Sequence, residues 1–81
     1  MRAKDGSKNS VGKRVKSQRL KLGLTQSVLC GKIANITDGE WNPTPQEIMR
    51  IENGKRLVTD LEIIALSNAL KCEACWLLTG K

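Results

Sequence analysis

The sequence predicts an all-α fold, a compact domain of five helices, and three observations support this prediction. Apolar residues recur at helical spacing along the 81-residue chain, and no segment alternates apolar and polar residues as a half-buried strand does. Threonine stands at three expected helix starts, and glycine stands at two expected helix ends. The chain has no Phe and no Tyr, so its small core must be built from Leu, Ile, Val, Ala and two tryptophans.

Two helices are expected in the first part of the chain. The first covers residues 10–22, and its inner stripe consists of Val11, Val15 and Leu22. Gly23 ends this helix, and Thr25 caps a second one over residues 25–33. The core-facing residues of this second segment are Leu24, Val28, Leu29 and Ile33.

An extended loop is expected over residues 34–43. Asn35, the pair Asp38-Gly39 and the pair Asn42-Pro43 are turn and breaker signals. Lengthening a surface loop costs little closure entropy, so a loop of this length is compatible with a stable fold. Trp41 within it is either an anchor that packs against the core or an exposed contact residue.

The third helix, residues 44–53, has the clearest pattern. Thr44 and Glu47 form a Thr-x-x-Glu capping box, Pro45 suits the first helical position, and Gly54 follows the last turn. Two isoleucines face one side, and the other side carries Gln46, Met49, Arg50 and Asn53. Gln and Arg can make bidentate contacts with adenine and guanine edges in the major groove. The pattern is therefore typical of a recognition helix.

Two further helices complete the predicted fold. Thr59 caps a fourth helix over residues 59–70, which is apolar on two sides: Leu61, Ile64 and Ala65 on one, and Ile63, Leu66 and Leu70 on the other. A helix that is apolar all round is normally central, so we expect this one to be the spine of the bundle. A short helix over residues 73–78 ends the chain.

The segments LGLTQ (22–26) and IMRIENGKR (48–56) resemble the phage-repressor (Xre/Cro-type) helix-turn-helix family. The resemblance covers residues 11–80, and it implies that the second and third helices form a helix-turn-helix that binds double-stranded DNA. The connection between these helices departs from the family, because it is roughly eight residues longer than the family's tight turn.

The resemblance also implies roles for individual residues. The expected base-reading residues are Thr44, Gln46, Met49 and Arg50, whereas Pro45 stands where some members carry a Gln or Arg reader. The expected phosphate contacts are Gln26, Asn53, Lys55 and Arg56, together with the basic Lys13 and Arg14 of the first helix. Arg19 and Glu52 are expected to form a salt bridge that joins the first helix to the end of the third.

The formal charge of +6 is unevenly distributed. Residues 1–22 carry eight lysines and arginines and one acid, whereas the rest of the chain carries six basic and seven acidic side chains. We expect residues 1–9 to be a basic, disordered arm and residues 10–81 to be the helix-turn-helix domain. The arm can bind a polyanion or simply increase solubility. No membrane span or signal-peptide pattern is present, so a cytoplasmic protein of bacterial or phage type is expected.

The cysteines and the remaining residues give no sign of catalysis. Cys72 and Cys75 form a C-x-x-C pair, and Cys30 is the third cysteine, but the chain has no His to complete a zinc site and no βαβ pattern for a redox site. We expect all three to be small apolar residues, with no metal and no cofactor. No nucleophile elbow or phosphate loop is present, so we do not expect an enzyme.

The sequence thus predicts a sequence-specific DNA-binding transcriptional regulator that acts as a repressor through its third helix. The alternative is a protein-interaction module, antitoxin-like or antirepressor, that keeps the fold, and a weaker one is a thiol-based metal or redox sensor. A single recognition helix reads few base pairs, so a homodimer is expected. Its expected interface is the last helix, through Trp76, Leu77 and Leu78, although the same residues could instead close the core.

Overall fold

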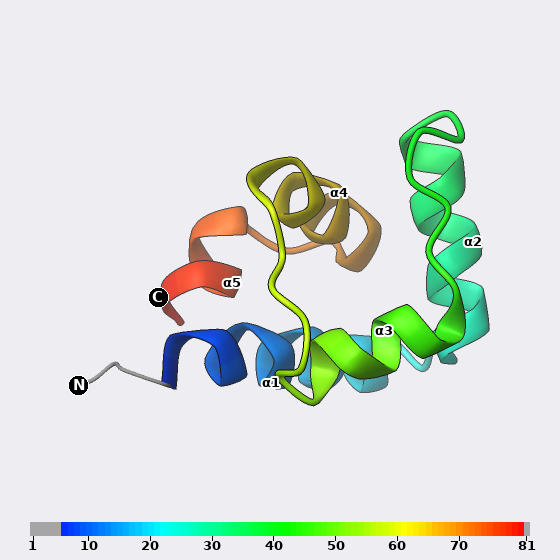
Figure 1. The fold of residues 1–81 in the computed structure, drawn as a ribbon. Coiled ribbons are helices and arrows are strands. Elements are labelled where there is room, and N and C mark those ends of the chain that lie inside the picture. The colour runs from blue at the N-terminus through cyan, green and yellow to red at the C-terminus, as the bar shows by residue number, and fades with distance from the viewer. Residues whose placement is uncertain (1–5, 81) are drawn as a thin grey trace.

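The computed structural model describes the backbone of residues 6–80 and the side chains of residues 11–80. Five helices form this part of the chain: α1 (Gly6–Lys21), α2 (Gln26–Ile36), α3 (Pro45–Glu52), α4 (Asp60–Leu70) and α5 (Ala74–Thr79). No strand occurs in it, so the predicted all-α class is confirmed. In Figure 1, α1 and α3 lie on one side of the molecule, α4 and α5 lie on the other, and α2 stands at one end.

The helix boundaries follow the capping signals in the sequence. The Thr25 hydroxyl accepts a hydrogen bond from the backbone N–H of Val28, which satisfies one of the free donors at the start of α2. Complete capping boxes begin α3 at Thr44 and α4 at Thr59. Gly23 and Gly54, which follow α1 and α3, both have a φ of +73°, where glycine is the residue of lowest strain.

Two expected boundaries were wrong. The backbone of α1 is helical from Gly6, so residues 6–9 belong to the helix and not to an arm; residues 1–5 of the expected arm, and residue 81, lie outside the described residues. The second helix continues to Ile36, because Asn35 alone does not end it. It ends where Asp38 and Gly39 adopt φ values of +59° and +82°. The connection to α3 is therefore residues 37–44.

This connection is attached to the core at several points. The Thr37 hydroxyl donates to the Ile33 carbonyl oxygen at 2.9 Å and accepts from the backbone N–H of Trp41 at 3.1 Å. Trp41 is partly buried and packs against the core, and Pro43 is buried. The guanidinium of Arg56 lies over the Trp41 ring, 5.9 Å from its centroid. Trp41 is therefore an anchor that packs against the core and not an exposed contact residue.

The core collects aliphatic residues from every helix. Its fully buried large side chains are Val15, Leu29, Ile33, Ile48, Ile51, Leu66, Leu70 and Leu77. The expectation that α4 is a central spine buried all round was wrong, since Leu61 and Ile64 are 78% and 51% exposed. Leu22 and Val28, expected in the core, are also exposed, because Leu22 lies in the turn after α1 and Val28 lies on the outer side of α2. Helical periodicity identified the apolar stripes but not which of them would be covered.

At Gly12 the backbone of α1 packs closely against the end of α3. A Cβ atom at this position would meet the backbone carbonyl oxygens of Ile51 and Glu52, which cannot rotate away as a side chain could. The absence of a side chain thus lets the first turns of α1 pack directly on the last turn of α3. The orientation of α3 depends on this contact.

We expect Gly12→Ala to lower the free energy of unfolding by about 2 kcal/mol or more, because the added methyl group must push the two helices apart. The matched control is Gly31→Ala in α2, where a Cβ would meet nothing within 4 Å. That substitution should raise stability by up to about 1 kcal/mol through helix propensity alone. Urea denaturation of both variants measures the difference, and equal effects would contradict the close packing of α1 on α3.

Candidate nucleic-acid interface

The outer face of α3 is exposed, and three of its four expected base-reading side chains have no internal hydrogen-bond or ion-pair partner among residues 11–80. Ile48 and Ile51 are buried, whereas Gln46, Met49 and Arg50 are exposed on the opposite side. Within residues 11–80 the side chains of these three form no hydrogen bond or ion pair. Thr44, the fourth expected base reader, is also exposed, and its hydroxyl oxygen accepts the capping bond from the Glu47 N–H at 3.2 Å. Its hydroxyl hydrogen remains available as a donor.

A buried ion pair fixes the other end of α3. Arg19 and Glu52 are 8% and 6% exposed, and they form a bidentate pair with Nε–Oε2 and Nη2–Oε1 distances of 2.6 and 3.2 Å. Arg19 also donates to the carbonyl oxygen of Leu24 at 2.9 Å. Burying two charges is tolerable only when their hydrogen-bonding capacity is used, and here three of the five Arg19 N–H groups have acceptors. These are the two residues expected to pair.

Gln26 joins α2 to the same pair. Its side-chain Nε2 donates to Glu52 Oε1 at 3.2 Å. The first residue of α2 is therefore hydrogen-bonded to the last residue of α3, although the connection between the two helices is long. This bond fixes the start of α2 to the end of α3, and the amide oxygen of Gln26 takes no part in it.

The expected phosphate-binding residues fall into two groups. Asn53, Lys55 and Lys13 are exposed, and no ion pair or side-chain hydrogen bond holds them among residues 11–80. Arg14 instead donates to the carbonyl oxygen of Leu77 at 3.1 Å, which ties α1 to α5. The Arg56 guanidinium also has internal partners, which are Glu62 on α4 and Glu47 on α3. Sequence position alone could not reveal these internal partners.

Arg56 binds the carboxylate of Glu62 through two hydrogen bonds of 2.8 and 3.0 Å and lies 3.9 Å from a Glu47 oxygen. The hydrogen bonds from Arg56 are the largest cause that holds the pKa of Glu62 below its ordinary value, and the capping bond from the Thr59 N–H acts in the same direction. Glu62 in turn raises the pKa of Arg56. Arg56 is thus a structural link between the turn after α3 and the start of α4.

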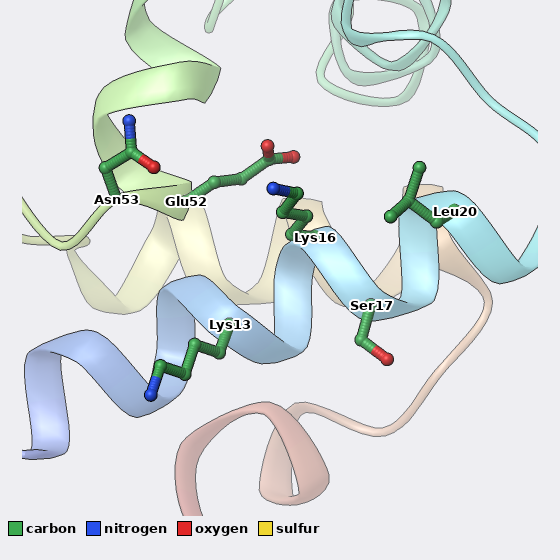
Figure 2. A pocket seen from close by; sticks show the side chains of 6 residues that line it. All are labelled: Lys13, Lys16, Ser17, Leu20, Glu52 and Asn53. Atoms are coloured by element: carbon green, nitrogen blue, oxygen red, sulfur yellow. The ribbon is translucent and has the colours of Figure 1, made fainter.

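A shallow groove of about 640 Å³ runs between α1 and the end of α3. Its lining residues are Lys13, Lys16, Ser17 and Leu20 of α1, with Glu52 and Asn53 from the other side. Figure 2 shows Lys16 reaching across it toward Glu52, whose carboxylate is already engaged by Arg19 and Gln26. Sequence reasoning missed Lys16 and Ser17. The spacing 13, 16, 17, 20 is one face of a helix and could have identified them.

The last helix provides less free apolar surface than expected. Leu77 is fully buried and Trp76 is partly buried against the core, so both close the bundle. Leu78 is 53% exposed. Of the three side chains expected at a dimer interface, Leu78 is therefore the one that projects from the surface.

The three cysteines are free thiols. Burial is the main cause that raises the pKa of the Cys30 and Cys72 thiols, which disfavours the reactive thiolate form. No group of three or more potential metal-ligating side chains occurs within the described part of the chain. The geometry around Cys72 and Cys75 thus supplies no argument for a metal centre.

Comparisons with known proteins add no assignment. No protein-family model matches the chain, and no solved structure matches it either. In the structure as described, none of the helices has the length and apolar character needed to cross a membrane.

We expect Arg19→Met and Glu52→Leu each to lower the free energy of unfolding by about 3–5 kcal/mol, because each leaves the other charge buried without its partner. The double variant should lose much less than the sum of the two, since no unpaired charge remains. Urea denaturation of the four proteins measures the coupling. Small and additive losses would show that the pair contributes little to the fold.

The Arg56–Glu62 pair predicts a pH dependence of stability. Because the folded pKa of Glu62 is lowered, the stabilisation is complete above the ordinary glutamate pKa and is lost as the pH falls through the folded value. Arg56→Met should remove part of this loss between about pH 6 and pH 3. Lys55→Met, at an exposed neighbour, is the control and should retain the wild-type dependence. Identical pH profiles for wild type and Arg56→Met in thermal denaturation would contradict the pair.

Proposed function

We propose that the protein is a sequence-specific DNA-binding transcriptional regulator that places α3 in the major groove. The observation that carries this proposal is the combination of a free polar face on α3 with a rigid attachment of its buried end through Arg19, Glu52 and Gln26. The major groove of B-DNA admits one α-helix, and sequence readout requires that the reading side chains be held in a fixed orientation. The sequence resemblance to Xre/Cro-type repressors supports the same function.

Each exposed residue of α3 suits a particular base contact. Arg50 can form a bidentate pair with guanine O6 and N7, and Gln46 can form one with adenine N6 and N7. Met49, which is 44% exposed, offers an apolar contact for a thymine methyl group. Thr44 at the start of the helix can donate its hydroxyl hydrogen to an acceptor atom on a base edge. The readout would thus extend over the length of α3.

Contacts to the DNA backbone are assigned to side chains that have no internal partner. Asn53 and Lys55 follow α3 directly, and Lys13 and Lys16 line the groove beside it. Such contacts set the position of the protein on DNA without reading sequence. Gln26 can contribute through its position at the start of α2, where backbone N–H groups favour an anion. Arg14 and Arg56 are omitted because their guanidinium groups are already hydrogen-bonded to acceptors within the protein.

Regulation would follow from occupation of an operator. A helix of 8 residues contacts few base pairs, so two copies on half-sites about one helical turn apart are needed to select a site in a genome. A homodimer of this kind would repress transcription wherever its operator overlaps a promoter. Leu78 at the exposed end of α5 remains available to a contact between such copies.

Selection of binding sites from random duplex DNA with the purified protein tests the function directly, and an enriched motif with salt-dependent affinity is expected. On that motif, Arg50→Ala should lose about 1–3 kcal/mol and relax the preference at one base pair. Lys55→Ala should weaken binding to all sequences alike and reduce the salt slope by about one. Failure to enrich any motif, or equal and sequence-independent losses from the two variants, would contradict the proposed readout.

A further inference from the structure

A second surface, formed by the C-terminal part of α2 and the outer side of α4, carries exposed apolar side chains. Ile36, Leu61 and Ile64 are 45%, 78% and 51% exposed, and all three line one hollow of about 600 Å³. Single exposed apolar residues are ordinary, whereas a contiguous group of them is a candidate interaction site. This is the stripe of α4 that the sequence predicted to be buried.

The hollow is continuous with a smaller one beside it. Thr37, Glu40, Leu61 and Ala65 line both, and the smaller hollow, about 240 Å³, extends to Trp41. Together they form a furrow between α2 and α4, lined by both apolar and polar side chains. We call it the α2–α4 furrow.

The charge of the furrow is opposite to that of the protein. Its lining includes the acidic residues Asp38, Glu40 and Glu62 and no lysine or arginine, although the whole chain carries a formal charge of +6. The charge of Glu62 is balanced by its pair with Arg56, so the free negative charge of the furrow is that of Asp38 and Glu40. Asp38 and Glu40 have no ion-pair partner among residues 11–80. A ligand for this surface must therefore combine apolar side chains with positive charge.

We propose that the α2–α4 furrow binds a basic amphipathic helix of another protein. A helix is the fitting element because the furrow is walled by two helices and the described residues contain no strand edge to which a strand could add. A second copy of this chain in a symmetric contact would bring the two acidic rims together, which is unfavourable. The furrow lies between α2 and α4, whereas α3 lies on the opposite side of the molecule from α4 in Figure 1. The helix could therefore bind whether or not α3 is engaged.

The probe is a labelled synthetic peptide of about 14 residues with leucines at i, i+3 and i+7, lysines flanking this stripe and alanines elsewhere. Fluorescence anisotropy with the full-length protein should show saturable binding. Backbone amide chemical-shift changes should be confined to the residues that line the furrow, Ile36 and Leu61 among them. A peptide with every lysine replaced by glutamate should bind about ten-fold more weakly or worse.

Two matched variants separate binding in the furrow from simple charge attraction. Leu61→Asp removes an apolar contact in the furrow, and Leu57→Asp adds the same charge at a leucine that is 73% exposed and lines neither hollow. Leu61→Asp should weaken the lysine peptide about ten-fold, whereas Leu57→Asp should leave its affinity nearly unchanged. Both exposed sites should tolerate the change without unfolding.

The proposal is overturned if Leu61→Asp leaves the affinity unchanged or strengthens it, or if the two peptides bind equally. It is also overturned if sedimentation shows that the protein associates with itself and that Leu61→Asp abolishes this, because the occupant would then be a second copy. No DNA is present in these measurements, so they stand apart from the proposed readout by α3.

Discussion

The buried pair of Arg19 and Glu52 is the interaction on which the arrangement of the other elements depends. Arg19 belongs to α1 and also holds the carbonyl oxygen of Leu24 before α2, while Glu52 ends α3 and also accepts from Gln26 at the start of α2. Three helices therefore meet at one carboxylate. An isolated helix of 8 residues is not stable in water, so α3 owes its existence and its direction to such contacts.

The long connection between α2 and α3 is compatible with a fixed angle between them for the same reason. A tight turn would set this angle through the backbone, whereas here residues 37–44 leave the backbone more freedom. Side chains replace that constraint at both ends: Gln26 and Glu52 at one end, Trp41 at the other, where the ring packs on the core under Arg56. Arg56 in turn is bound to Glu62 of α4, so the connection is linked to the second half of the bundle.

Structural features that depend on residues close together in the sequence could be predicted, whereas contacts between residues far apart in the sequence could not. The capping boxes of α3 and α4 and the left-handed Gly54 depend on neighbours within a few residues, and their helices were predicted within about two residues. The extension of α2 to Ile36 was missed, since a lone Asn is a weak breaker compared with the left-handed Asp38 and Gly39. The Arg56–Glu62 pair and the exposed Leu61 depend on which helix packs where, and periodicity carries no information about that. The candidate-site residues on α3 could therefore be predicted, whereas the prediction for α1 missed Lys16 and Ser17.

The distribution of unpaired charge gives the molecule two surfaces that can act independently. Four basic side chains on α1, on α3 or just after α3 form no ion pair in the described structure: Lys13, Lys16, Arg50 and Lys55. The unpaired acidic residues Asp38 and Glu40 lie at the α2–α4 furrow.

The molecule measures 23 Å across its two shorter dimensions. At physiological ionic strength the Debye length is about 8 Å, so charges on opposite faces are largely screened from each other. The acidic furrow therefore has little effect on the electrostatic potential at the basic residues of α1 and α3. Any influence of one surface on the other must then pass through α2, which packs against both α3 and α4 and is bound to α3 through Gln26 and Glu52.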